Sequence, residues 1–191
     1  MVGLGFEKLA RAVAVLKNTP RTGWIQRGVP RGEAETVAEH TFMVTAILGY
    51  ISASCSALCL DRERMILMGI IHDMGEAVSG DIPRSLTERL GKDLKEGVES
   101  EIIQGIFGGS DGGRLTGLFL EYLERKTTEA KTVKIADLLA TLGQAETYLE
   151  RGFPVGDIIE SCREEAQRMI DEIQEEDLRL LLNAILASKG R

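Results

Sequence analysis

The chain has 191 residues, of which 43% are hydrophobic and 28% charged, and its formal net charge is −7. This length and apolar fraction suffice for one domain with a substantial core, and the charged fraction excludes a disordered or fibrous protein. The negative charge argues against a broad contact with nucleic-acid phosphates. Any phosphate bound here would therefore be held locally, by a metal ion or a few cationic side chains.

No segment has the features of a membrane span or a signal peptide. The apolar runs are far shorter than the roughly 18 residues that a bilayer-crossing helix needs, and charged residues interrupt the N-terminal stretch at helical spacing. The three cysteines, Cys55, Cys59 and Cys162, include no CxxC pair. Cys55 and Cys59 have a spacing compatible with a thiolate site, but we interpret all three as small buried residues in a reducing compartment. We therefore expect a cytoplasmic protein without membrane contact.

Apolar residues recur at helical spacing along the chain, and no alternating strand pattern is found. We predict helices over residues 5–17, 37–58, 61–76, 85–107, 113–125, 128–151 and 156–188. The stretch FGGSDGGRL is predicted to be a turn and not a phosphate-binding loop, because no Gly-Lys-Ser or Gly-Lys-Thr follows it. No repeat or flexible linker divides the chain. The predicted fold class is all-α, a single helical bundle over residues 1–191.

The last predicted helix, residues 156–188, carries apolar residues at helical spacing beside a strongly acidic face. A helix of this kind buries its apolar stripe against a neighbour. We expect it either to close the core or to contact a second subunit.

The sequence contains two histidines, and both lie in apolar surroundings. His40 follows Thr36 and Glu39, whose T-x-x-E spacing is that of a capping box, so His40 is predicted in the first turn of a long, buried helix. His72 ends the apolar run MILMGII and is followed directly by Asp73. A single histidine on an apolar face is usually a core residue, but two histidines and an adjacent aspartate favour a metal site.

A further acidic residue, Asp137, lies in the apolar stretch TVKIADLLATL. A buried carboxylate needs a cation or several hydrogen bonds to offset its desolvation. One candidate partner is Lys134, three residues earlier on about the same helix face. The other is a metal ion shared with His40, His72 and Asp73, since two imidazoles and two carboxylates suit a divalent first-row ion. The residues alone leave both alternatives open.

The order of these residues resembles that of the HD-domain metal-dependent phosphohydrolases. His40, His72-Asp73 and Asp137 match the four positions of the family's motif. The segments RTGW, ETVAEHTF, IIHDMGEAVSGDIP and TVKIADLL, within residues 21–140, are similar to those of the small HD proteins of the 5′-deoxynucleotidase type. The resemblance covers roughly residues 5–150. It implies a single HD domain in which these four residues hold one divalent metal ion.

The ligand types and the histidine count limit this metal centre. Nitrogen and oxygen ligands without thiolate fit Mn, Co, Fe, Ni or Zn. HD enzymes with binuclear centres use additional histidines, and this chain has two in all. A single-metal site is therefore expected, which disfavours cleavage of cyclic dinucleotides.

The resemblance also implies roles for two acidic residues after the His-Asp pair. Glu76 is four residues after His72, so both lie on one face if the helix continues. The resemblance implies that Glu76 is catalytic and takes a proton from the attacking water or orients it; the alternative is a surface acid at a helix end. Asp81 is expected in the following loop, where the resemblance implies a contact with the 3′-hydroxyl group of the sugar. The alternative is a cap of the next helix, for which Ser85 is the better candidate.

Three further residues are expected to bind substrate. Arg21 would hold the phosphate through its planar fork. Trp24, the only tryptophan, would exclude a ribose 2′-hydroxyl as the resemblance suggests, or would serve for packing. Lys134 would help to hold phosphate, or would pair with Asp137.

Two departures from the best-known deoxynucleotidase pattern precede His40. The arginine and tryptophan of that pattern are adjacent, whereas Thr22-Gly23 separates them here, and the VPRGEAE stretch is longer. Both changes fall where the sugar would be selected. They weaken the deoxyribose assignment more than the phosphohydrolase assignment.

These features predict a cytoplasmic enzyme that hydrolyses nucleoside 5′-monophosphates, in particular 2′-deoxyribonucleotides, to nucleoside and phosphate. The alternatives are an HD phosphohydrolase for another small phosphate ester or nucleotide, and a metal-bound binding or assembly module without turnover. Glu76, Asp81 and Arg21 favour an enzyme, because a purely structural metal site would not need them. We expect a small nucleotide as the partner and no stable binding of nucleic acid. The resemblance implies a homodimer.

Overall fold

The computed structural model describes residues 2–55, 60–83, 89, 92–107 and 109–188. Within these ranges the secondary structure is helical, apart from one isolated bridge between Pro20 and Thr36. The helices are α1 (Val2–Leu16), α2 (Thr22–Ile25), α3 (Val37–Ser54), α4 (Arg62–Ile71), α5 (Glu76–Ser79), α7 (Lys92–Phe107), α8 (Gly109–Glu124), α9 (Thr128–Glu150), α10 (Gly156–Asp171) and α11 (Glu176–Ser188). The predicted all-α class is confirmed. No helix in the described part of the chain is both long enough and apolar enough to cross a membrane.

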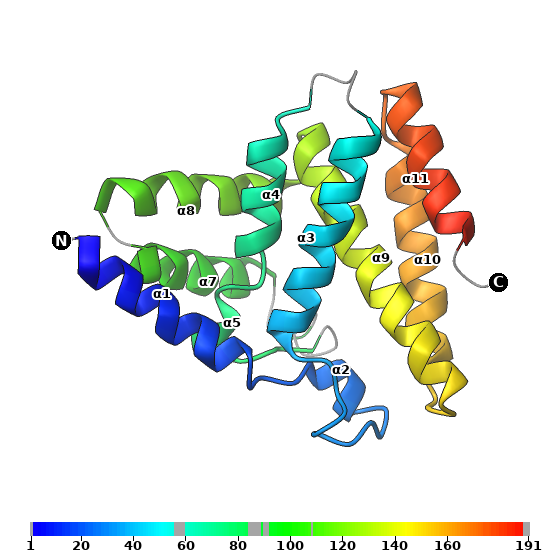
Figure 1. Ribbon diagram of the computed structural model, residues 1–191, viewed down its shortest axis with the longest axis horizontal. Coiled ribbons are helices and arrows are strands. Elements are labelled where there is room, and N and C mark those ends of the chain that lie inside the picture. Colours follow the sequence, from blue (N-terminus) through cyan, green and yellow to red (C-terminus); the bar gives the residue numbers. More distant parts are fainter. Residues whose placement is uncertain (1, 56–59, 84–88, 90–91, 108, 189–191) are drawn as a thin grey trace.

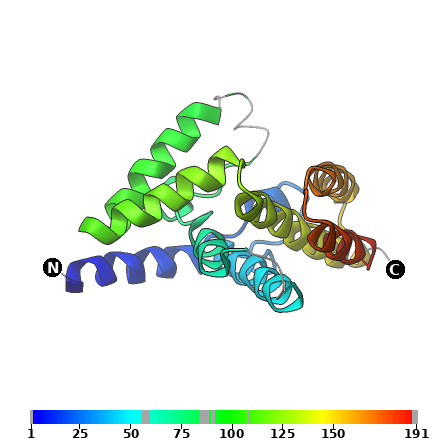
Figure 2. The ribbon, with the colours of Figure 1, turned by 90° about the horizontal axis from the view of Figure 1, so that it is seen from above.

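Helix α9 lies between two groups of helices (Figure 1). One group contains α1, α7 and α8 near the N-terminal end, and the other contains α10 and α11 near the C-terminal end; Figure 2 shows the same division from above. Helices α3 and α4 both pack against α9. The sequence explains this central position, because α9 has buried residues around most of its circumference and therefore needs neighbours on several sides.

Three apolar clusters meet on α9. Ala130, Val133 and Ala136 belong to the first cluster, which also takes residues from α1, α3, α4, α7 and α8. Ile135, Leu139 and Leu142 belong to the second, shared with α3, α10 and α11. Ala145 and Tyr148 belong to the third, in which Trp24 of α2 is buried. The C-terminal helices thus close the core, as one of the two alternatives for residues 156–188 predicted.

The prediction of one continuous helix over residues 61–76 is wrong. Helix α4 ends at Ile71, residues 72–75 form turns, and α5 begins at Glu76. In this segment the amide of Met74 donates to the carbonyl of Ile71 (3.0 Å) and the amide of Glu76 donates to that of Asp73 (3.1 Å). These bonds span three residues and wind the chain more tightly than an α-helix. The four-residue spacing therefore does not place His72 and Glu76 on one α-helical face.

Other predicted boundaries also need correction. Residues 156–188 form two helices, because the chain leaves the helix after Asp171, buries Ile173 in the core and starts α11 at Glu176. Part of the expected FGGSDGGRL turn is the first turns of α8, where Gly112 lets the backbone approach Phe107: an added Cβ would lie 3.3 Å from the Phe107 carbonyl carbon. Residues 56–58 and 85–88 of the predicted helices, and Cys59, lie outside the described residues.

The crossing of α3 and α4 depends on Gly69. A Cβ at this position would lie 2.5 Å from Cδ1 of Leu48, a side chain that is fully buried in the first cluster. The absence of a side chain at residue 69 therefore determines how closely α4 approaches α3.

Replacing Gly69 with alanine is expected to lower the free energy of unfolding by about 1–3 kcal/mol, because the added methyl group must displace a buried leucine. Gly105 provides a matched control, since it is exposed on α7 and has no heavy atom within 4 Å of its Cβ position. Gly105→Ala should raise stability by about 0.4–1 kcal/mol. Urea unfolding of both variants makes the comparison, and equal stability would contradict this account of the α3–α4 contact.

Candidate metal centre

His40 lies in the first turn of α3, and the local sequence explains its place. The predicted capping box is present: the Thr36 hydroxyl accepts from the Glu39 amide (3.2 Å), and the Glu39 carboxylate accepts from the Thr36 amide (2.7 Å). This cap starts α3 so that His40 points into the core, where it is fully buried. Burial, followed by the nearby charge of Arg21, lowers the pKa of His40 to about 4. The ring is therefore neutral at physiological pH, the form in which imidazole binds metals.

His72 caps the C-terminus of α4 and is 3% exposed. Its Nδ1 lies 2.8 Å from the carbonyl oxygen of Gly69. Because a carbonyl oxygen only accepts, Nδ1 carries the hydrogen and Nε2 presents its lone pair to the site. Nε2 lies 3.2 Å from Oδ2 of Asp73. Two acceptor atoms at this distance repel each other unless a proton or another cation lies between them.

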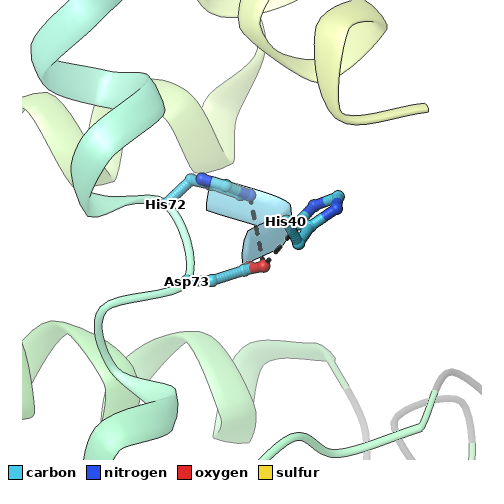
Figure 3. A group of neighbouring side chains, drawn as sticks. All are labelled: His40, His72 and Asp73. Atoms are coloured by element: carbon cyan, nitrogen blue, oxygen red, sulfur yellow. Dashed lines mark ion pairs between the residues drawn. The ribbon is translucent and has the colours of Figure 1, made fainter. Parts of the chain in front are cut away.

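The two histidines and Asp73 converge (Figure 3). Each offers a ligand atom, and these atoms lie within 4.8 Å of one another. Oδ2 of Asp73 is 3.8 Å from Nε2 of His40 and 3.2 Å from Nε2 of His72. These three side chains come from the start of α3 and the end of α4, two helices that pack against each other. Three of the four predicted ligands therefore share one place.

The fourth predicted ligand, Asp137, lies on α9 and is 8% exposed. It is not part of the three-residue group, but its Oδ1 is 3.0 Å from Nε2 of His40. Its Oδ2 accepts from Nζ of Lys134 at 2.7 Å. Although burial alone would raise it, the pKa of Asp137 is held well below its ordinary value by Lys134 and His40. The pairing with Lys134 is thus present at Oδ2, while Oδ1 contacts His40, and a metal-ligand role for Asp137 stays a prediction.

These residues fit a divalent metal ion. The donors are two imidazole nitrogens and carboxylate oxygens, a set that suits first-row divalent ions. The lone pairs of His72 Nε2 and Asp73 Oδ2 face each other in a buried place, which a cation would stabilise. Burial acts to lower the pKa of His72, but Asp73 outweighs it and the pKa is raised. A proton at Nε2 of His72 is thus held more strongly than on a free imidazole, and a metal ion would have to displace it.

Glu76 lies in α5 and is 5% exposed, so the alternative of a surface acid is wrong. Its backbone amide donates a hydrogen bond to the carbonyl of Asp73, which connects Glu76 to the segment that carries His72 and Asp73. Burial in this position agrees with a role inside the site. The catalytic assignment itself stays a prediction.

Arg21 and Asp81 come from two different loops and meet at the edge of this centre. Nη1 of Arg21 is 3.7 Å from Oδ2 of Asp73, which places one cation beside the expected ligands. The Asp81 carboxylate accepts from the amide of Thr22, and the Asp81 carbonyl accepts from the Thr22 hydroxyl at 2.8 Å. The loop after α5 is therefore bound to the start of α2, directly beside Arg21. A contact of Asp81 with the sugar stays a prediction.

Trp24 is 2% exposed and packs in the third cluster. Its ring is 5.1 Å from that of Tyr148, with an edge-on arrangement, and its Nε1 donates to Glu35 at 3.0 Å. The sequence left two roles open for Trp24, sugar selection and packing. The observed contacts are those of a packing residue. A contact with the sugar stays a prediction, as does binding of phosphate by Lys134, whose ammonium pairs with Asp137.

Glu35 was missed in the sequence. It is 8% exposed, binds Trp24 through Oε2 and has Oε1 at 4.0 Å from Nδ1 of His40. Burial raises the pKa of Glu35, against the opposing effect of Arg21. The stretch GEAETVAEH contains three glutamates, and spacing alone gives no reason to select the one before the N-cap residue.

The affinity for a divalent ion should fall as the pH is lowered through the raised pKa of His72. The ion has to displace the proton on His72, so below that pKa binding should weaken by up to about tenfold per pH unit. Calorimetric titration of the metal-free protein with Zn²⁺ between about pH 6 and 8, in two buffers of different ionisation enthalpy, measures both the affinity and the protons released. An affinity that does not change with pH would contradict this reading of His72.

Known proteins share both the sequence pattern and the fold. The HD-domain family model matches residues 13–178. The chain is 32% identical over 145 residues to the 5′-deoxynucleotidase hdd1 of Schizosaccharomyces pombe, an alignment that covers 72% of this chain and 69% of the relative. It is 30% identical over 150 residues to the 5′-deoxynucleotidase HDDC2 of Danio rerio, covering 77% and 70%.

Solved structures agree with these matches. The PH0347 protein of Pyrococcus horikoshii OT3 superposes with a TM-score of 0.78 at 31% identity, over 95% of this chain and 98% of that one. An HD-domain phosphohydrolase of Listeria innocua, lin2634, is 20% identical and shares the fold with a TM-score of 0.68, over 96% and 90%. The family match spans all four predicted metal ligands, three of which the structure gathers and the fourth of which it places beside His40. The chain belongs to the HD-domain family.

Proposed function

We propose that this protein is a divalent-metal-dependent 5′-nucleotidase that hydrolyses nucleoside 5′-monophosphates, with 2′-deoxyribonucleotides as its preferred substrates. The observation that carries the proposal is the buried convergence of His40, His72 and Asp73, with Asp137 in contact with His40. The relatives named 5′-deoxynucleotidase, at 30–32% identity, support the substrate class. We further propose that residues 1–191 form one domain, since all three apolar clusters share α9.

The proposed reaction assigns a task to each residue near the centre. A divalent ion held by His40, His72, Asp73 and Asp137 would polarise the phosphoryl group and acidify the attacking water. Arg21 lies on the Asp73 side of the ligands, where its guanidinium binds the phosphate oxygens through paired hydrogen bonds. The Arg21 side chain is 19% exposed, so it is open to a substrate from one side.

Glu76 is proposed to take the proton of the attacking water. The water oxygen forms a bond to phosphorus and the bond from phosphorus to the 5′-oxygen breaks. The leaving oxygen takes up the proton that Glu76 gained, which gives the nucleoside and restores the carboxylate. Glu76 is buried directly after the segment that carries His72 and Asp73, which supports this assignment. Asp81 is proposed to accept a hydrogen bond from the sugar 3′-hydroxyl, and Lys134 to add positive charge near the phosphate.

A binding module without turnover is the competing proposal from a different class. It requires only the metal ligands. Arg21 beside the ligands and the buried Glu76 favour the enzyme, because a purely structural centre needs neither a phosphate-binding cation nor a second buried acid. An HD phosphohydrolase for another small phosphate ester is compatible with the same centre, and the substrate screen below separates it from a nucleotidase.

Three finer points are also proposals. The metal is one of Mn, Co, Fe, Ni and Zn, as the nitrogen and oxygen donors indicate. A cytoplasmic location agrees with Cys55 and Cys162, which are buried free thiols.

A homodimer is supported by apolar side chains on the surface of α3, where Phe42, Met43 and Tyr50 are 77%, 49% and 60% exposed. Sedimentation of a monomer at micromolar concentration would contradict the dimer.

The proposed activity is tested by phosphate release. Ribo- and deoxyribonucleoside 5′-monophosphates should be incubated with the protein and each of the five ions in turn. We expect release from the 5′-monophosphates, faster for the deoxyribonucleotides, and none from 3′-monophosphates. Release from simple phosphate esters alone would favour the broader phosphohydrolase, and no release with any ion would contradict the enzyme.

Removing the carboxylate of Glu76 should abolish turnover while the metal stays bound. Glu76→Gln and Glu76→Ala are expected to lower kcat by about 10²–10⁴-fold, because the proton acceptor is lost. Metal content, measured by elemental analysis, should stay close to that of the unchanged protein. Val78→Ala is the matched control in the same short helix, since Val78 is 70% exposed. Loss of metal in Glu76→Gln would mean that Glu76 is a ligand and not the base.

A further inference from the structure

Glu35 occupies a fixed position between the metal ligands and the third apolar cluster. Its amide donates to the hydroxyl oxygen of Tyr148 on α9 at 2.7 Å, and its carbonyl accepts from the amide of Arg21 at 2.9 Å. It directly precedes Thr36, the N-cap residue of α3. Two distant parts of the chain, α9 and the segment before α2, therefore hold the backbone of Glu35 directly before the N-cap of α3.

The two carboxylate oxygens of Glu35 face two different ring nitrogens. Oε2 accepts from Nε1 of Trp24 at 3.0 Å. Oε1 is 4.0 Å from Nδ1 of His40. Nδ1 is buried and makes no hydrogen bond with any of the described residues. Glu35 is thus the acidic group that this nitrogen faces.

In the metal-free structure Nε2 of His40 donates to Oδ1 of Asp137 at 3.0 Å, whereas a metal ion bound at Nε2 would require the hydrogen to lie on Nδ1. Nε2 is the nitrogen that lies near Asp73 and Asp137, at 3.8 and 3.0 Å, so it is Nε2 that would bind a metal and must be unprotonated. A neutral imidazole then carries its hydrogen on Nδ1. A buried N–H without an acceptor is costly, and histidine ligands of metals generally donate this hydrogen to a carboxylate or carbonyl.

We propose that Glu35 is a positioning residue for the metal centre: one carboxylate oxygen holds the indole N–H of Trp24 and the other accepts the Nδ1–H of His40, so that Nε2 is fixed toward the metal. A metal ion held at Nε2 would leave the hydrogen of His40 on Nδ1, and Oε1 of Glu35 is the acceptor that this nitrogen faces. This inference rests on the proposed metal site and adds to it a residue that the sequence motif does not contain, which links His40 to Trp24 of α2.

The two-sided contact explains why this position needs a carboxylate. Trp24 and His40 each present an N–H donor, and a carboxylate offers an acceptor oxygen to each. A glutamine has the same shape but offers one oxygen and one NH₂ group. In Glu35→Gln, the glutamine oxygen can accept from only one of the two N–H groups. The NH₂ group must then face the other N–H group, and two donors cannot form a hydrogen bond. Replacing Trp24 with phenylalanine removes one donor and with it the conflict.

The test measures Zn²⁺ binding and the histidine tautomer, so it does not depend on turnover. Glu35→Gln should weaken Zn²⁺ binding by about 10–100-fold, the usual effect of losing such a partner. The loss should become much smaller in a Trp24→Phe background, where the glutamine oxygen is free for His40. Glu39→Gln is the charge-matched control, because Glu39 is exposed, adjacent to His40 in sequence and bound to Thr36 instead. It should change Zn²⁺ binding by less than about threefold.

Nitrogen-15 NMR of the histidine rings gives an independent readout. The chain contains only two histidines, so with an untagged protein the spectrum shows the ring nitrogens of these two residues alone. In the Zn²⁺-loaded protein, His40 should carry its hydrogen on Nδ1, with a strongly hydrogen-bonded proton shift that disappears in Glu35→Gln.

Each outcome bears on the proposal. An equal loss of Zn²⁺ affinity in the presence and absence of Trp24 would overturn the shared carboxylate, and unchanged affinity in Glu35→Gln would overturn the positioning role. Failure of the unchanged protein to bind Zn²⁺ would instead count against the metal site itself. If Glu35→Gln does not fold, the nitrogen-15 spectrum of the unchanged Zn²⁺-loaded protein still tests the positioning role, since a His40 Nδ1 without a hydrogen-bonded proton would overturn it.

Discussion

The candidate metal centre depends on the balance between the negative charge of buried carboxylates and the positive charge of a few nitrogen groups. Asp73, Asp137 and Glu35 are largely withdrawn from water, and an isolated charge in such a place is strongly destabilising. The described cations beside them are the guanidinium of Arg21 and the ammonium of Lys134. Because the acids outnumber these cations, the site has an excess of negative charge that a divalent ion would neutralise. The same low polarity that makes the acids costly makes their attraction to such an ion strong.

The helices fix the relative positions of these charged side chains. His40 is set by the capping box of α3, His72 and Asp73 by the end of α4, and Asp137 by the middle of α9. Since α9 contributes to all three apolar clusters, its position is restrained from several sides. A site whose ligands sit on packed helices keeps its distances better than a site built on loops. Two of the four residues assigned to substrate, Arg21 and Asp81, lie in contrast in connecting segments.

The sequence was informative where local rules dominate. The T-x-x-E spacing correctly predicted the cap that orients His40, and the apolar surroundings of His72 and Asp137 correctly predicted their burial. The break after Ile71 was not predictable from periodicity, because apolar spacing continues through the segment while the backbone hydrogen bonds shift to tighter turns. Glu35 was missed for a related reason. Its importance comes from contacts with Trp24 and His40, which tertiary structure creates and residue spacing does not reveal.

Gly69 has a consequence that reaches beyond helix packing. The absence of its side chain lets α4 lie close to α3, while its carbonyl oxygen accepts the hydrogen of His72 Nδ1. The spacing between two helices and the direction of the His72 nitrogen that is proposed to bind metal are therefore coupled through one residue that has no side chain. Any change that pushes the helices apart would also rotate the imidazole. Substitutions in the α3–α4 contact would therefore disturb the orientation of His72 as well as the packing of the two helices.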